Sequence, residues 1–426
     1  MKTFFKAWFL AAILPFASAG TAYSGTVVID NTDRHQSIQG FGTSLIHWKS
    51  DIRAIYETEK FQRDFAETMG LNIIRVNLLG DVLPAKNLPK PLDQMRPDDI
   101  RHENFDKEHP NIQVFLQFSQ AIKKRNPDVK IIGSVWSPPA WMKVNGSLTD
   151  SSSDHIGIGT NYELRNRKTQ AKNRLQKDYY EHYGEYLLEW VKWFAEEGVP
   201  FDAISIANEP RFTQEFRSCV WTADDYADMV GILGKKLDEA GFPEVRIFGA
   251  EDMTHAFNAS YDDPSWLGGN ALYLDRIMHH EEASQYFDIM ATHGYEDGVT
   301  ADTKPENIMK VWEMIEPHGL DLWITEGGTQ GHEWPTPVTG GIANRVHTAL
   351  VMGNVTAFVP WQITDNYYYE GALMKDGKMT PKSYAFQHDG QFIDAGAVRI
   401  GVQAPDCPLA VSAYNHAEDK TLTIVI

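Results

Sequence analysis

Cysteine is scarce in this chain of 426 residues, which contains only Cys219 and Cys407. Two cysteines cannot form the disulfide framework of a small secreted domain or supply the thiolates of a structural zinc site. The fold must therefore be stabilised by an ordinary hydrophobic core. One Cys219–Cys407 bridge and two free thiols are both compatible with the sequence, because spacing along the chain does not give the distance between the sulfur atoms.

Basic charge is also in short supply. The chain has 39 Lys and Arg against 58 Asp and Glu, a formal net charge of -19. Nucleic acid and anionic membrane surfaces would be repelled, so neither is expected as a partner. The acidity is accounted for by solubility and says little about the substrate.

Long hydrophobic runs are absent after the first 19 residues. No stretch in that part of the sequence approaches the roughly 18 apolar residues of a membrane span. At the N-terminus, Lys2 and Lys6 precede a short apolar run at 7–16, and small residues follow at 17–19. This pattern is typical of a cleaved export signal. We therefore expect residues 1–19 to be a signal peptide and the mature protein to be secreted or periplasmic.

Short β-rich apolar segments recur along the chain with helical periodicity between them, which is the pattern of repeated βα units. Eight parallel strands with outer helices close a barrel. The predicted fold class is therefore α/β, a (β/α)8 TIM barrel over residues 37–387. The eight predicted strands are 37–42, 72–79, 129–136, 201–209, 245–251, 287–295, 321–326 and 355–362.

The two ends of the chain do not follow the barrel pattern. Strand-like segments at 26–30, 397–400, 409–413 and 421–426 predict a β-sandwich side domain made from residues 20–36 and 388–426. The last segment stops without a turn or a partner strand. We therefore expect the sandwich to be incomplete and the sequence to be truncated there.

Two connections are unusually long. Residues 80–109 are rich in proline and charge, and residues 145–169 are rich in serine, glycine and aspartate. Both follow strands on the face where barrel active sites lie, so we expect them to wall a substrate groove. Surface insertions without a role are the alternative.

Two glutamates stand where predicted strands end. Asn208-Glu209-Pro210 closes the fourth strand, and Glu326 closes the seventh. Side chains at the ends of barrel strands meet at one mouth, and glycoside hydrolysis requires a pair of carboxyl groups on either side of one sugar ring. The Asn208 amide could bind a sugar hydroxyl. Glu251, at the end of the fifth strand, is the main rival carboxylate and is assigned a supporting or substrate contact.

Taken together, the motifs resemble those of glycoside hydrolase family 30, retaining β-glycanases with a (β/α)8 barrel and an attached β-sandwich. The resemblance covers almost all of the chain after the signal. The shared motifs are Gly40-Phe-Gly-Thr43, Trp136-Ser-Pro-Pro-Ala-Trp-Met142, Asn208-Glu-Pro210, Ser218-Cys-Val-Trp-Thr222, Thr325-Glu326, Lys378-Met-Thr-Pro-Lys-Ser-Tyr384 and Gly396-Ala-Val-Arg-Ile400.

The resemblance implies that Glu209 is the acid/base and Glu326 the nucleophile. It also implies that Arg75 orients the nucleophile and keeps it ionised, while Glu209 holds a raised pKa. Three further roles follow in the same way: Tyr295 hydrogen-bonds the nucleophile, and Trp136 and Trp361 wall the sugar subsite. His293 could line the same mouth, although a strand-end histidine is as often structural.

Substrate signals in the sequence point two ways. Gly42-Thr-Ser-Leu-Ile-His-Trp48 is similar to the endo-β-1,6-galactanase branch, whereas the motif at 218–222 is similar to the xylanase branch. In the glucuronoxylan-specific branch an arginine follows the eighth-strand tryptophan, but here Gln362 and Asp365 stand in that region. We therefore do not expect dependence on a glucuronate side chain.

The function predicted from the sequence is an exported retaining endo-β-glycanase acting on β-1,4-xylan or β-1,6-galactan or glucan. No nucleotide-binding loop, zinc helix or serine nucleophile elbow stands in the required context, so no cofactor or metal is expected. An exo-acting β-glycosidase and a non-catalytic carbohydrate-binding barrel are the alternatives. A polysaccharide or oligosaccharide is expected as the substrate partner.

Overall fold

The computed structural model describes residues 26–48, 51–150, 172–211, 216–253, 269–293, 295, 305–328, 331, 333–365, 371–418 and 420–426. The predicted signal peptide at 1–19 lies outside these residues. So does most of the long connection at 145–169.

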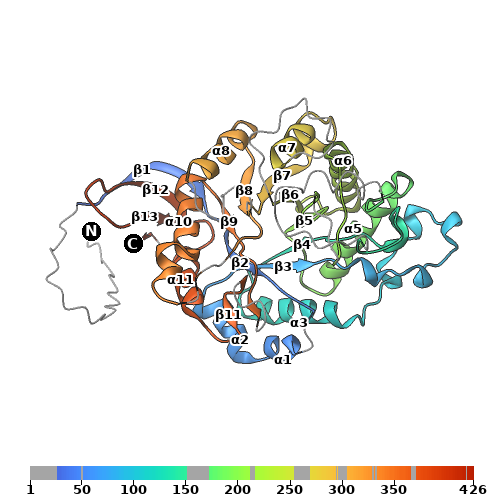
Figure 1. Ribbon diagram of the computed structural model, residues 1–426, viewed down its shortest axis with the longest axis horizontal. Coiled ribbons are helices and arrows are strands. Elements are labelled where there is room, and N and C mark those ends of the chain that lie inside the picture. Colours follow the sequence, from blue (N-terminus) through green and yellow to red (C-terminus); the bar gives the residue numbers. More distant parts are fainter. Residues whose placement is uncertain are drawn as a thin grey trace.

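The predicted TIM barrel is confirmed: eight strands close into a parallel barrel in chain order. Each predicted segment contributes to one strand, and most strands are shorter than their segments; the first strand runs two residues past its predicted end and the fifth one residue past its own. They surround the centre of the molecule in Figure 1. The strands are β2 (Gly40–Ser44), β3 (Ile73–Asn77), β4 (Lys130–Ser134), β5 (Ala203–Ser205), β6 (Arg246–Asp252), β7 (Phe287–Thr292), β8 (Asp321–Ile324) and β9 (Ala357–Phe358).

Helices cover the outside of the barrel, as Figure 1 shows. A short π-helical segment, Asp64–Thr68, continues the second helix. The α-helices are α1 (Ile52–Tyr56), α2 (Glu59–Arg63), α3 (Pro110–Arg125), α5 (Tyr180–Glu196), α6 (Ala223–Ala240), α7 (Asn270–Met278), α8 (Pro305–Ile315), α9 (Thr336–Thr339), α10 (Ile342–Met352) and α11 (Pro381–Gly390).

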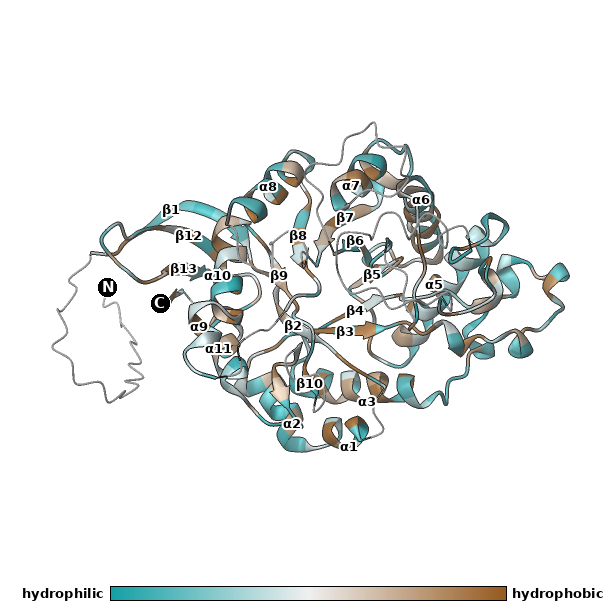
Figure 2. Cartoon of the chain, viewed as in Figure 1, coloured by the Kyte–Doolittle hydropathy of each residue, from teal (hydrophilic) through white to brown (hydrophobic). Residues whose placement is uncertain are grey.

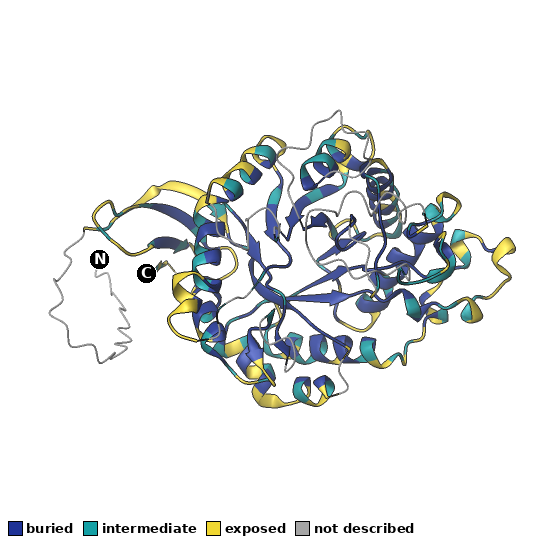
Figure 3. Cartoon of the chain, viewed as in Figure 1, coloured by how far each residue is buried: buried dark blue, intermediate teal, exposed yellow. Residues whose placement is uncertain are grey.

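The core has two parts. Small and branched side chains with two large aromatics, Phe248 and Trp323, fill the inside of the barrel. A larger cluster lies between the strands and the helices. Helices such as α6 and α7 show apolar and polar sides in Figure 2, and the barrel strands are almost wholly buried in Figure 3. Burial on both faces explains why the strands read as continuous apolar segments in the sequence.

The two ends of the chain meet in one antiparallel sheet beside the barrel, to the left in Figure 1. Its order is β1 (Val28–Ser37), β12 (Val398–Gln403), β13 (Ser412–His416) and β14 (Thr421–Val425). Among the described residues this is a single sheet, with no second sheet facing it. The boundary expected at 387/388 falls inside α11, and the sheet begins again only at Val398.

The long connection at 80–109 is built from short 3₁₀ turns that pack against α5. Tyr186 of α5 donates a hydrogen bond to the Leu79 carbonyl at 2.8 Å, where the connection starts. The turns are Gly80–Val82, Ala85–Asn87, Leu92–Gln94, Pro97–Asp99 and His102–Asn104. A small strand pair, β10 (Thr364–Asp365) and β11 (Met374–Lys375), follows the last barrel strand.

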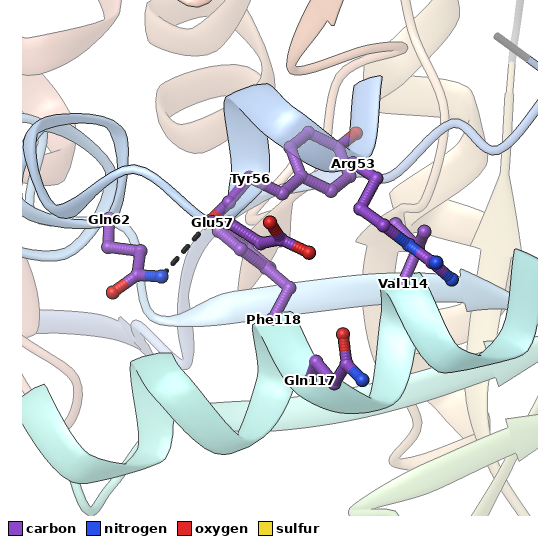
Figure 4. A pocket seen from close by; sticks show the side chains of 7 residues that line it. All are labelled: Arg53, Tyr56, Glu57, Gln62, Val114, Gln117 and Phe118. Atoms are coloured by element: carbon purple, nitrogen blue, oxygen red, sulfur yellow. Dashed lines mark hydrogen bonds between the residues drawn. The ribbon is translucent and has the colours of Figure 1, made fainter. Parts of the chain in front are cut away.

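Three further features bear on the earlier expectations. Cys219 and Cys407 are both free thiols, and Cys219 is buried. In the described part of the chain, none of the helices has the length and apolarity needed to cross a bilayer. A small pocket where α1, α2 and α3 meet is shown in Figure 4; it contains the Gln62 to Tyr56 hydrogen bond of 3.0 Å and no barrel strand contributes to its lining.

Candidate active site

The strand ends bring the predicted site residues to one end of the barrel. Arg75 lies within β3 and Glu251 near the end of β6, while His293 directly follows β7. Glu209 and Glu326 come four and two residues after β5 and β8, so that all five approach from different strands of a parallel barrel. Side chains from the carboxyl ends of such strands share one mouth.

Arg75 is the centre of the site, and each of its five N–H groups has a hydrogen-bond acceptor. Its Nη1 donates to Glu326 Oε2 at 2.8 Å, and its Nη2 donates to Asn208 Oδ1 at 2.6 Å and to Glu251 Oε1 at 3.0 Å. Nε donates to Ser134 and Nη1 also to Ser44, at 3.1 and 3.2 Å. A fully buried guanidinium with every donor satisfied is a rigid positive charge.

Glu209 and Glu326 face one another across this charge. An oxygen of each, together with a nitrogen of His293, lies within 4.8 Å of the others. Tyr295 donates its hydroxyl to Glu326 Oε1 at 3.0 Å, and His293 Nδ1 lies 3.1 Å from Glu209 Oε1. The two carboxyl groups therefore lie close together but have different hydrogen-bond partners.

The environment gives these groups unusual proton affinities. Burial raises the pKa of Glu209 to about 7; the His293 hydrogen bond opposes this shift and the charge of Glu326 adds to it. Burial alone would lower the pKa of His293, but the charge of Glu326 and its hydrogen bonds to Glu209 and Glu251 raise it to about 9. At neutral pH the site therefore holds an imidazolium beside a glutamate near its midpoint.

Glu251 is a third buried carboxylate, the rival to which the sequence assigned a supporting or substrate contact. Besides its Arg75 contact, it accepts a hydrogen bond from Ser134 at 3.1 Å and lies 3.7 Å from His293 Nε2. Burial, the largest single effect, would raise its pKa, but the Arg75 charge, the hydrogen bond and charge of His293 and the Ser205 hydrogen bond together outweigh burial and lower the pKa to about 2. Glu251 is therefore a fixed negative charge that contacts both Arg75 and His293 and stabilises their positive charges.

Both Glu209 and Glu251 have left-handed backbone conformations, with φ of 44° and 61°. Non-glycine residues rarely adopt such angles, and they concentrate at functional sites where the surrounding structure enforces them. Tyr183 of α5 helps to fix the backbone before Glu209, because its hydroxyl donates a hydrogen bond to the Ile206 carbonyl at 2.6 Å. Nothing in the sequence signals these conformations, since neither position is Gly or Asn.

Aromatic rings wall the site. The Arg75 guanidinium lies 4.7 Å from the centre of the Trp136 ring, and Trp136 and Trp361 have ring centres 6.2 Å apart. The structure thus brings together all eight predicted site residues: Arg75, Trp136, Asn208, Glu209, His293, Tyr295, Glu326 and Trp361. It adds Ser44 and Ser134, which accept hydrogen bonds from Arg75 and were not singled out in the sequence.

Among the residues that the structure describes, two groups of side chains have the donor types for a metal ion. Glu209, His293 and Glu326 form one, and His102, Glu103 and Glu189 the other. In the second group, Glu189 already binds Lys192 at 2.7 Å and the His102 backbone N–H at 2.8 Å. In the first group, the carboxylates already have Arg75, Tyr295 and His293 as hydrogen-bond partners. The positive charges of Arg75 and His293 therefore balance the negative charge of the carboxylates.

The match to a family model agrees with this geometry. Residues 38–315 match the glycosyl hydrolase family 30 TIM-barrel domain. This match spans more than half of the chain, and the protein therefore belongs to glycosyl hydrolase family 30.

Particular relatives are more distant. The chain is 28% identical over 269 residues to glucuronoxylanase XynC of Bacillus subtilis (strain 168), covering 62% of this chain and 56% of that protein. It is 24% identical over 335 residues to an endo-1,6-beta-D-glucanase of Neurospora crassa, covering 76% and 61%. The chain thus spans little more than half the length of these curated relatives.

Among solved structures, the fold is similar to that of Xyn30A, a family 30 subfamily 8 xylanase from Clostridium acetobutylicum. The TM-score is 0.66 at 21% identity, and the match covers 92% of this chain and 82% of the other. At this identity the likeness concerns the fold alone.

Proposed function

We propose that this protein is an exported, retaining endo-β-glycanase that cuts a hemicellulose-type polysaccharide by double displacement. The observation that carries the proposal is the Glu209–Glu326 pair, whose oxygens approach within 4.8 Å at the mouth of the barrel. Membership of a glycoside hydrolase family and the named activities of the relatives support the same class of reaction. Export is supported by the pattern of residues 1–19.

In the first step, a Glu326 oxygen attacks the anomeric carbon and the bond from that carbon to the leaving oxygen breaks. Glu209 gives its proton to the leaving oxygen. Arg75 and Tyr295, which donate to the two Glu326 oxygens at 2.8 and 3.0 Å, hold the attacking carboxylate in place. A glycosyl ester on Glu326 and a free sugar end result.

In the second step, a water molecule attacks the anomeric carbon and gives a proton to Glu209. The ester bond breaks, Glu326 leaves as a carboxylate, and Glu209 is again an acid. A pKa of about 7 lets Glu209 serve in both directions near neutral pH. His293, which contacts both carboxylates at 3.1 and 3.9 Å, supports the change of charge between them.

The spacing favours retention over inversion. Inverting enzymes hold their two carboxyl groups about 6.5–9.5 Å apart to admit a water, whereas retaining enzymes hold them about 5–5.5 Å apart. Oxygens within 4.8 Å of one another leave no space for an intervening water and a sugar carbon in line. The proposed substrates are β-1,4-xylan and β-1,6-galactan or glucan, following the two sequence branches and the named activities of the relatives.

The test is to incubate purified protein with xylan, β-1,6-galactan and β-1,6-glucan, to size the products and to follow the anomeric protons by NMR. We expect oligosaccharides of several lengths with the β-anomer appearing first. Glu209→Gln and Glu326→Gln should lower kcat by at least about 10²-fold. The α-anomer first would contradict retention, monosaccharides alone would indicate exo action, and binding without hydrolysis would indicate a carbohydrate-binding barrel.

A further inference from the structure

A row of aromatic rings leads outward from the catalytic centre. It starts with Trp136 over Arg75 and passes to Trp361. Trp361 in turn stacks on Trp48, with ring centres 5.6 Å apart and planes inclined by 23°. Trp48 is the outer end of the row and is 47% exposed. A large apolar ring exposed beside a binding site offers a stacking face to the apolar side of a sugar.

A polar cluster adjoins the exposed tryptophan. The His47 ring meets Trp48 edge-on at 5.4 Å, and His47 Nε2 lies 3.5 Å from Arg217 Nη1. Arg217 Nη2 donates to Asp81 Oδ2 at 2.5 Å, and His109 lies 3.6 Å from the same oxygen. The Arg217 and Asp81 side chains remain 25% and 29% exposed, so each can also meet a ligand hydroxyl.

A buried lysine fixes this cluster relative to the inner tryptophans. Lys143 Nζ donates to Ser137 Oγ at 3.0 Å and to the Ser218 carbonyl at 2.7 Å. Ser137 follows Trp136, and Ser218 follows Arg217. One side chain therefore ties the segment carrying the inner ring to the segment carrying the arginine.

The Asp81 segment is held just as closely. A Cβ on Gly80 would lie 2.5 Å from the Ser137 carbonyl oxygen and 2.6 Å from that of Pro138, so only glycine allows this approach. Asp81 is therefore fixed against the same strand end. The aromatic row and the polar cluster form one continuous wall rather than two separate loops.

The charges along this wall are already balanced. Arg217 is paired with Asp81, and Arg211, two residues after Glu209, binds Asp252 through two contacts of 2.8 and 2.6 Å. A uronate carboxylate placed beside Arg217 would also meet Asp81. Sugar hydroxyls, in contrast, can bond to both members of an ion pair without a charge penalty.

We propose that Trp48 and the Arg217–Asp81 pair form an outer sugar subsite, next to the catalytic one, that takes an uncharged sugar residue. The inference rests on the proposed function and names its substrate class as a neutral β-glycan of several units. The subsite stacks one sugar ring on the Trp48 face that is turned away from Trp361. Its hydroxyls bond to Arg217 and Asp81.

Binding in the Glu326→Gln background tests the subsite without turnover. Isothermal titration with β-1,4-xylohexaose and β-1,6-glucohexaose would give a Kd for the better ligand. We expect Trp48→Ala to weaken that Kd by about tenfold or more and Trp48→Phe to restore most of it. Phe392→Ala, which removes an aromatic ring that is 54% exposed near the side sheet, is the matched control and should change nothing.

A separate variant tests the preference of the subsite for an uncharged sugar. Asp81→Asn leaves Arg217 unpaired, so the affinity for a glucuronate-substituted xylo-oligosaccharide should rise relative to the unsubstituted one, by about tenfold. An unchanged Kd in Trp48→Ala, or wild-type preference for the acidic ligand, overturns the subsite. Failure of the wild type to hydrolyse any of the three polymers contradicts the proposed function instead. The binding measurements in the Glu326→Gln background do not depend on hydrolysis, so they test the subsite independently.

Discussion

Glu209 and Glu326 are the same kind of side chain, and their neighbours make them different. Glu326 receives hydrogen bonds from a cation and a phenol, whereas Glu209 is buried beside His293. The first arrangement favours an attacking carboxylate, and the second an acid that can release its proton. The assignment of roles therefore follows from the partners of each residue.

The pH dependence of activity should report Glu209. Because the first step needs Glu209 protonated and burial raises its pKa to about 7, kcat/KM should fall as the pH rises through about 7. A kcat/KM profile from pH 4 to 9 on a soluble oligosaccharide would show this alkaline limb. A limb centred below about pH 5.5 would contradict the assignment.

Glu251→Gln should slow catalysis while the protein stays folded. The amide keeps the volume but removes the charge that balances Arg75 and His293, so we expect kcat to fall about 10–100-fold with little change in KM. With one carboxylate fewer, the uncompensated cations should also move the alkaline limb to lower pH. A purely structural role would leave the pH profile in place.

Glu185→Gln is the matched control for that variant, since Glu185 is another buried glutamate in ion pairs, with Lys236 at 3.3 Å and Lys192 at 3.7 Å on the outer helices. It should leave both kcat and the pH profile unchanged. Equal kinetic effects of the two variants would show that loss of any buried glutamate, rather than of Glu251, accounts for the result.

Among the elements, the strands were the most predictable part. Each has apolar residues on both faces, which marks a buried parallel strand, and counting them was enough to predict the barrel. The lengths of most strands were overestimated because apolar residues continue past the last strand pairing; β9, for example, is only Ala357–Phe358. Glu209 and Glu326 were found because a carboxylate after an apolar segment is conspicuous.

The rest of the site could not be found this way because it depends on distance in space. Trp48, Asp81 and Arg217 lie on three different connections, and only the folded barrel brings them together. Likewise, Ser44 and Ser134 are ordinary strand residues in the sequence, and only the structure shows that they accept hydrogen bonds from Arg75. Sequence patterns identify the ends of elements, whereas long-range side-chain contacts require the structure.

Helix α11 contains an acidic group that should limit stability at alkaline pH. Burial raises the pKa of Asp389 to about 7. A carboxyl group whose folded pKa is raised contributes stability below its unfolded value near 4, and that contribution is lost as the pH rises through about 7. Asp389→Asn should therefore raise the free energy of unfolding at pH 8 by about 1–3 kcal/mol and have little effect near pH 4.

Urea unfolding at the two pH values would measure this difference. Asp238→Asn, at an exposed position on α6, is the control and should be neutral at both pH values. An equal shift at pH 4 and pH 8 would show that the effect of Asp389→Asn does not come from ionisation.

For the molecule as a whole, the side sheet and the barrel are joined by a polar network. Gln36 of β1 donates to the Leu350 carbonyl at 2.7 Å. Arg399 of β12 donates to Gln36 at 2.9 Å and to Asn354 at 2.7 Å. These contacts link both strands to α10 and to the connection that follows it, so we expect the sheet and the barrel to unfold together.

Arg399→Met should lower the free energy of unfolding by about 2 kcal/mol, because it removes two hydrogen bonds and leaves two partly buried acceptors without this donor. Arg399→Lys should lose less, and kcat should be unaffected in both variants. Calorimetry would show one transition for the wild type. Two separate transitions in the wild type would mean that sheet and barrel are independent.

The way in which Arg75 is anchored has a consequence for engineering. If Glu326 were shortened to glycine, the guanidinium would still be held by Ser44, Ser134, Asn208 and Glu251. The space left by the carboxylate would then lie beside the Arg75 guanidinium, and a small anion such as formate, azide or fluoride could occupy it. Such a variant would accept an activated glycosyl donor from that side and join sugars instead of separating them.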